Sequence, residues 1–299
     1  MSDTGLTRRA ILRRSVATVG AGAIASTAGC GGLNPLGGGG PYIEWLPAPD
    51  ELDEDHYGFF YFDMDAIEST EDQFDDDSFD PESFQQAWDP VSVDWEDTSM
   101  VLSLASNIVV EADFDRGSVA EDLEDADYDD DTDHEGYTIF LGPAELRAFA
   151  VSDSDIVVTG GGYNPGDPVD IAEVIIDATT GNVARYADEN EDMSTLVGEL
   201  GAGTFVSGST REQPETASPG NGVFDDMVAS GSTTEVNGDT ADETWVVVYD
   251  TADDVDTGDL EDWVDENSDD GEFADVDDIS YTQNGRMGII TGTIDTDDI

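Results

Sequence analysis

Charge is the feature that most limits what this chain can fold into. The sequence has 299 residues, of which 72 are acidic and 9 are basic, so the formal net charge is −63. Every basic residue is an arginine, and no lysine is present. Such a charge suits either a disordered chain that cannot gather a core or a folded protein that works in molar salt. In molar salt the Debye length falls to about 3 Å, which screens self-repulsion.

The apolar residues favour the folded protein. Hydrophobic residues make up 38% of the chain, including five Trp, nine Tyr and twelve Phe, whereas disordered chains are poor in aromatic residues. The acidic residues are spread along the chain, and apolar runs survive between them. The absence of lysine resembles the haloarchaeal pattern, in which Asp and Glu replace surface Lys. We therefore expect a halophilic protein with an acidic surface that holds solvent cations loosely.

The same charge restricts the partners of the protein. A surface this negative repels phosphates, so nucleic acid is excluded as a partner. An anionic membrane surface should repel it as well. Any contact with a membrane must therefore come from an anchor.

Residues 1–29 resemble a twin-arginine lipoprotein signal peptide. Residues 7–13 contain the pair Arg8-Arg9 followed by two apolar residues, and residues 16–28 form a mild apolar stretch. As a helix this stretch would span about 20 Å, which is too short for a hydrocarbon core of roughly 30 Å. The following Thr27-Ala28-Gly29-Cys30 is similar to a lipobox. The resemblance implies export by the twin-arginine pathway, cleavage before Cys30 and a lipid on its thiol.

Cys30 is the only thiol in the sequence, so no disulfide can form within one chain. The alternative to lipidation is a buried free cysteine that acts as a small hydrophobic residue. Its position directly after the apolar stretch favours lipidation. Residues 30–41 are rich in glycine and read as a flexible tether that holds the domain roughly 15–20 Å from the lipid. We expect a protein anchored to the outer face of the cell membrane.

The remaining chain predicts an α+β fold with mostly antiparallel sheets and a few short helices packed on one face. We place a first half at residues 42–210, a linker loop at 211–222 and a smaller second half at 223–299. Short helices are expected near residues 118–126, 170–179, 193–200 and 259–264. Asn284-Gly285 predicts a closing hairpin. Residues 116–123 and 257–263 look alike, through either duplication of one unit or chance.

Residues 43–210 also resemble exported lipoproteins of haloarchaea, whose activity is not known, and related exported proteins of bacteria. The resemblance rests on four short motifs. They are Leu46-Pro47-Ala48-Pro49, Asp113-Phe114-Asp115, Gly136-Tyr137 and Ala150-Val151-Ser152-Asp153. These motifs are structural rather than catalytic, so the resemblance implies a fold and no activity.

The acidic residues offer one motif of metal-binding type. Aspartates alternate along residues 125–133, and from Asp131 the first positions match a calcium loop. Gly142 stands where that loop needs a bidentate Glu. We therefore predict a solvated acidic loop and no metal site.

No catalytic or cofactor residue can be singled out. Only two histidines are present, His56 and His134, so no His pair exists for zinc. The sequence also lacks a nucleophile elbow and a phosphate-binding glycine motif. Carboxylate pairs of the glycosidase type are not excluded, because so many acidic residues offer countless pairs.

Two functions remain open. The first is a non-catalytic binding or envelope-accessory lipoprotein, with an envelope protein as its partner. The alternative is an exported hydrolase that uses a carboxylate pair or a cation-assisted site. The anchor, the tether and the lack of a catalytic motif favour the first, without deciding whether the protein is an enzyme.

The export motif is open to a direct test. Replacing Arg8-Arg9 by Lys-Lys should leave the protein in the cytoplasm, because that pathway recognises the arginine pair. Fractionation of a halophilic host followed by immunoblotting measures the distribution. Normal export of the Lys-Lys variant would contradict the twin-arginine prediction.

Overall fold

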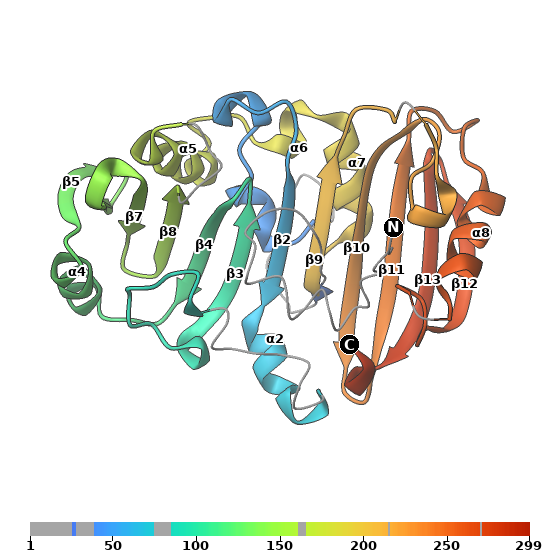
Figure 1. Cartoon of the computed structure of the whole chain (residues 1–299), viewed down its shortest axis with the longest axis horizontal. Helices are drawn as coiled ribbons and strands as arrows, with labels where there is room; N and C mark the ends of the chain where they lie inside the picture. Colours follow the sequence, from blue (N-terminus) through green and yellow to red (C-terminus); the bar gives the residue numbers. More distant parts are fainter. Residues whose placement is uncertain (1–25, 28–38, 75–84, 161–165, 215, 270) are drawn as a thin grey trace, which may run out of the picture.

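Runs of apolar residues build one continuous antiparallel sheet (Figure 1). The computed structural model describes residues 26–27, 39–74, 85–160, 166–214, 216–269 and 271–299. Its strands follow one another across the sheet as β12 (Asp277–Asn284), β13 (Met287–Asp295), β11 (Thr240–Tyr249), β10 (Met227–Asn237), β9 (Gly203–Thr210), β2 (Gly58–Asp63), β3 (Thr98–Leu104), β4 (Asn107–Ala112), β8 (Asp155–Gly160), β7 (Arg147–Val151), β6 (Tyr137–Leu141) and β5 (Asp129–His134). The expected α+β class with an antiparallel sheet is confirmed.

Short helices connect and cover these strands. They are α2 (Met64–Ser69), α4 (Arg116–Asp125), α5 (Pro168–Thr180), α6 (Tyr186–Glu189), α7 (Glu191–Leu200) and α8 (Thr257–Asn267), with 3-10 turns η1 (Pro41–Trp45) and η2 (Pro49–Leu52) at the start. A two-residue strand β1 (Ser26–Thr27) pairs with the start of β9. None of the helices in the described part has the length and apolar content needed to cross a membrane.

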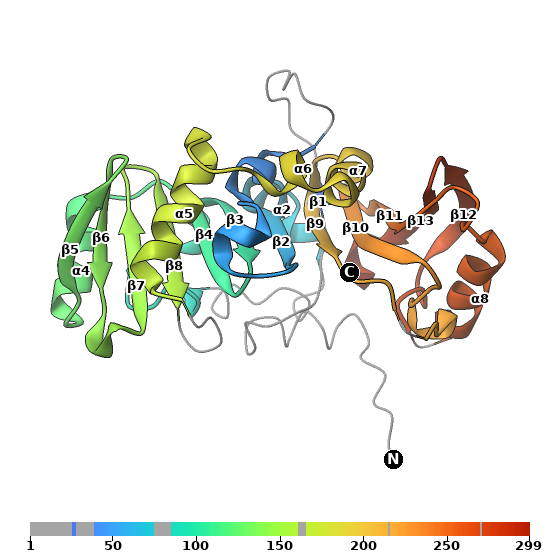
Figure 2. The ribbon, with the colours of Figure 1, turned by 90° about the horizontal axis from the view of Figure 1, so that it is seen from above.

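Helices lie on both faces of the sheet rather than on one (Figure 2). Tyr61 and Val206 belong to the core beneath α5 and α7, and we call this side the α5 face. Their chain neighbours Phe62 and Phe205 belong to the core beneath α2 and α4, and we call this side the α4 face. Because successive strand residues point to opposite faces, strands that are apolar at consecutive positions require a cover on both sides.

The same connectivity occurs twice in the sheet. In each of two sets, three strands are followed by a helix and two more strands, and the last strand lies beside the third. The sets are β2-β3-β4-α4-β7-β8 and β9-β10-β11-α8-β12-β13. The β5–β6 hairpin extends the first set. The first strands of the two sets, β2 and β9, pair with each other. The helices correspond as well. Asp115 and Asp256 cap α4 and α8, and in each helix the buried residues stand four and eight positions after the cap.

The segments that looked alike in the sequence therefore occupy equivalent places in the two sets. The predicted linker at residues 211–222 is the loop between β9 and β10. β9 pairs with both β2 and β10, so one sheet contains both halves.

The acidic segment after residue 128 is a strand rather than the predicted loop. β5 forms the outer edge of the sheet and pairs with β6 through a tight turn in which Glu135 and Gly136 both have positive φ. That turn geometry matches the twist of a hairpin, so β6 imposes the extended conformation on a run of poor strand formers. Its exposed aspartates also protect the edge from pairing with another chain.

The α4 packing allows a matched test of the core. Leu123 is fully buried in the core of the α4 face, whereas Leu146 is the one large hydrophobic side chain that is exposed in the described part, at 69%. Leu123→Ala should lower the free energy of unfolding by about 2–5 kcal/mol, because it removes buried apolar contacts and leaves a cavity. Leu146→Ala should change it by less than about 0.5 kcal/mol. Guanidinium unfolding in constant molar salt measures both, and equal effects would contradict the packing described.

Candidate functional site

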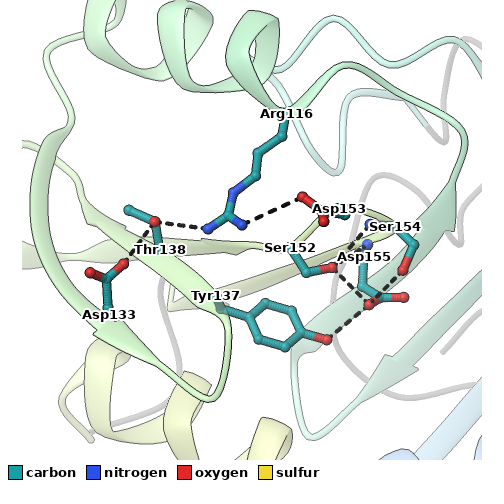
Figure 3. Close-up of polar contacts among 8 residues, drawn as sticks. All are labelled: Arg116, Asp133, Tyr137, Thr138, Ser152, Asp153, Ser154 and Asp155. Atoms are coloured by element: carbon teal, nitrogen blue, oxygen red, sulfur yellow. Dashed lines mark hydrogen bonds and ion pairs between the residues drawn. The ribbon is translucent and has the colours of Figure 1, made fainter.

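Asp155 is the centre of a hydroxyl cluster at the turn between β7 and β8 (Figure 3). Its Oδ2 accepts hydrogen bonds from the Tyr137 hydroxyl at 2.9 Å, from Ser152 Oγ at 2.8 Å and from Ser154 Oγ at 3.0 Å. Three hydroxyl donors therefore converge on one oxygen of this side chain. The cluster ties the start of β6 to the β7–β8 turn through a single carboxyl group.

A second carboxyl group, that of Glu111, lies directly opposite Asp155 across β4 and β8. Opposed residues of neighbouring strands have Cβ atoms about 5 Å apart. Burial raises the pKa of Glu111, the charge of Asp155 raises it further, a hydrogen bond from Trp45 lowers it and Glu44 raises it. Glu111 and Asp155 are thus two half-buried carboxyl groups with different environments, which is the arrangement that the hydrolase alternative requires.

The α4 face of the same region carries a separate polar contact (Figure 3). Arg116 NH2 donates to Thr138 Oγ1 at 2.9 Å, and that hydroxyl donates to Asp133 Oδ1 at 2.9 Å. The guanidinium also lies 3.6 Å from a carboxylate oxygen of the exposed Asp153. These contacts connect α4 with the two outermost strands and pair the Arg116 guanidinium with a carboxylate.

The two histidines lie apart in the fold. His134 Nε2 lies 2.9 Å from Asp177 Oδ1, and Nδ1 lies 3.7 Å from Glu173, so the ring clips the edge strand β5 to α5. His56 is exposed in the segment before β2. Neither ring has a serine or cysteine among its hydrogen-bond partners in the described chain, so neither has the arrangement of a nucleophile with its base.

The acidic groups of the described residues contain one set with metal-ligand spacing. Asp295, Asp297 and Asp298 offer carboxylate oxygens within 4.8 Å of one another, and all three are exposed at the end of the chain. Asp131, from which the calcium-loop pattern starts, lies exposed on β5. A strand cannot wrap a cation as that loop does, so the extended backbone removes the calcium interpretation.

Two arginines hold main-chain carbonyl groups. Arg147 donates to the carbonyl oxygens of Asp89 and Ala87, and its guanidinium lies 4.7 Å from the centre of the Phe149 ring. Arg185 donates to the carbonyl oxygens of residues 178 and 179, both at 2.9 Å, at the end of α5. Such donors neutralise the partial negative charge at a helix end or a turn. These arginines serve the fold.

Arg286 joins the last hairpin to α7. It donates to Asp192 Oδ1, to the carbonyl oxygen of Glu191 at 3.2 Å, to Thr195 Oγ1 at 3.1 Å and to the carbonyl oxygen of Tyr249 at 3.1 Å. The Arg286 guanidinium is therefore used to hold the hairpin against α7 and the end of β11.

Arg211 differs from the other four arginines of the described chain. Its side chain makes one hydrogen bond, from NH2 to Ser230 Oγ at 3.2 Å, and no carboxylate of the described residues pairs with it. Burial lowers the pKa of Arg211. In a chain with 72 acidic residues, a half-buried cation without an anionic partner is a candidate binding group, and no pattern in the sequence distinguishes it.

The fold and its polar clusters define an antiparallel α+β sheet protein. No protein-family model matches the chain, and no curated protein matches it. Among solved structures, the chain is similar to crystal forms of TP0453. Form III has a TM-score of 0.49 at 9% identity, over 86% of this chain and 94% of that chain. Form I has a TM-score of 0.44 at 10% identity, over 87% and 95% of the two chains. Likeness at this level assigns neither a family nor an activity.

The residues predicted from the sequence to act in export and anchoring are not among those described. Arg8, Arg9 and Cys30 all lie outside the described ranges. The sequence predicted no catalytic or cofactor residue, and it missed Glu111, Asp155 and Arg211, because one carboxylate or arginine among many carries no local pattern.

The Glu111 carboxyl group allows a test by pH. Because its folded-state pKa lies above the ordinary value of 4.5, ionised Glu111 costs stability above the folded pKa and costs nothing below 4.5. Glu111→Gln removes that charge, so it should raise the midpoint of thermal unfolding near neutral pH. The difference should shrink as the pH falls through the folded pKa of Glu111. Thermal scans across this range in molar salt measure it, and a difference that does not depend on pH would contradict the assignment.

Proposed function

We propose that this protein is a lipid-anchored lipoprotein of the envelope of a halophilic archaeon, exported by the twin-arginine pathway, with a non-catalytic binding or accessory role. One observation carries the proposal: the fold begins immediately after the glycine tether. η1 starts at Pro41, and Tyr42 is fully buried. The Tyr42 hydroxyl donates to the carbonyl oxygen of Gly201 at 2.9 Å, just before β9. A lipid on Cys30 would therefore hold the sheet within a short tether of the membrane.

Charge supports this arrangement of anchor and domain. The acidic domain is repelled by anionic headgroups, so it needs a covalent lipid rather than surface contact. A single acyl chain gives only marginal anchoring, so a two-chain lipid suits a stable attachment. With the attachment at the start of β9, the sheet extends into the external medium and presents its surface to envelope partners.

The carboxyl groups of Glu111 and Asp155 keep the hydrolase alternative open. In that function Glu111, whose pKa is raised by burial, would act as the acid and Asp155 as its partner. The hydroxyl cluster argues for a structural role, because Tyr137, Ser152 and Ser154 already occupy an oxygen of Asp155. A hydrolase would lose all activity in the Glu111→Gln variant while keeping its fold.

The anchor is tested by replacing the thiol. Cys30→Ser should move the protein from the membrane fraction to the external medium, because serine cannot carry the thioether-linked lipid. Gly29→Ala, which keeps a small residue before the cysteine, is the matched control and should stay with the membrane. Fractionation in molar salt followed by immunoblotting measures both. Retention of the Ser variant on membranes would show that the lipid is not the anchor.

A further inference from the structure

Arg211 is the one arginine of the described part whose guanidinium contacts neither a carboxylate nor a main-chain carbonyl group. Arginine has five N–H donors, and this one donates a single hydrogen bond, to Ser230. Arg116 and Arg286 contact carboxylates, whereas Arg147 and Arg185 hold main-chain carbonyls. In so acidic a chain, the cation without a partner is the exception that requires an explanation.

The strand register places two serine side chains on the same face of the sheet as this guanidinium. Ser209 and Ser230 are directly paired across β9 and β10, and the Arg211 main-chain N–H continues that ladder to the carbonyl oxygen of Val228. Since alternate residues of a strand share a face, Arg211 and Ser209 lie side by side. On the other side, Ser209 pairs with Gly58, which has no side chain to cover it.

The free donors of this group reach solvent. Arg211, Ser209 and Ser230 are each half-buried, and none of their side-chain polar atoms is among the buried atoms of the described chain that lack a partner. The unused N–H groups of Arg211 and the Ser209 hydroxyl are therefore open to a ligand while being partly shielded from bulk water. Partial shielding strengthens a charge-assisted hydrogen bond.

The group lies at the end of the sheet away from the anchor. Residues 39 and 40 lie beside Val197 and Ala202, at the start of β9, whereas Arg211 follows the last residue of the same strand. Eight residues of extended chain span about 25 Å. In the proposed anchored protein, Arg211 therefore faces away from the lipid.

We propose that Arg211, with Ser209 and Ser230, binds the oxyanion group of a small external ligand, so that the binding role proposed above is exercised at this site. The inference that the ligand comes from the envelope rests on that proposed function, but the anion site itself does not. The guanidinium fork matches an anion with two oxygens, such as a carboxylate, phosphate or sulfate, better than spherical chloride. This preference matters in molar chloride, where charge attraction alone is screened within about 3 Å.

The test is anion binding by the full chain in molar potassium chloride. Inorganic phosphate, sulfate and acetate are titrated separately at constant ionic strength, and binding is followed by calorimetry. Comparing the three anions distinguishes a preference for tetrahedral oxyanions from a preference for a planar carboxylate. At least one of them should bind with 1:1 stoichiometry. Arg211→Gln should weaken that binding roughly tenfold or more, and Ser209→Ala by a few-fold. Arg116→Gln removes the same charge from a guanidinium that already faces a carboxylate, that of Asp153, and should bind as the unmodified chain does.

Several outcomes would overturn the site. They are the binding of none of the three anions by the unmodified chain, equal binding by Arg211→Gln, or an equal loss in Arg116→Gln. If Arg211→Gln does not fold, Arg211→Lys and Ser209→Ala carry the test, and unchanged binding in both overturns it. Failure of the site differs from failure of the anchor: the Cys30→Ser variant should bind the anion unchanged even when it is released from the membrane.

Discussion

The pairing of β2 with β9 is the contact on which the rest of the fold depends. It joins two sets of strands with the same connectivity into one sheet, and each strand is apolar on both sides at this junction. Without the pairing, Tyr61, Phe62, Phe205 and Val206 would all lie at exposed strand edges. With it, α5 and α7 cover one face and α2 and α4 the other, so a chain of such high charge still buries a continuous core.

The few cations of the chain show how that core is held together. Arg116, Arg147 and Arg286 connect elements that are distant in sequence, by holding carbonyl groups or carboxylates. Arg185 holds carbonyl groups at the end of the neighbouring helix α5. Helix starts use acidic caps instead, as Asp115 and Asp256 do for α4 and α8. A carboxylate at a helix start accepts a hydrogen bond from the first turn and interacts favourably with the positive end of the helix dipole. The abundant acidic residues therefore stabilise the helices at these positions.

The polar clusters differ in whether their hydrogen-bonding groups are satisfied within the protein. The hydroxyl cluster on Asp155 and the clip between His134 and Asp177 are satisfied within the protein, and they stabilise the outer strands. Arg211 is not satisfied in that way. It lies at the far end of β9 from Pro41, where it gives an acidic protein a position suited to the anion proposed above.

The sequence by itself determined the antiparallel α+β class, and it predicted a halophilic protein with a lipid anchor, because charge, a lone cysteine and runs of apolar residues are local or compositional features. It also predicted the four longer helices and the Asn284-Gly285 hairpin turn. Only the tertiary structure decided the rest. The conformation of β5 depends on its partner β6, the cover on both faces depends on the β2–β9 junction, and the isolation of Arg211 depends on which carboxylates fold away from it. Each is a relation between distant residues, and no local pattern in a chain this acidic distinguishes one carboxylate from another.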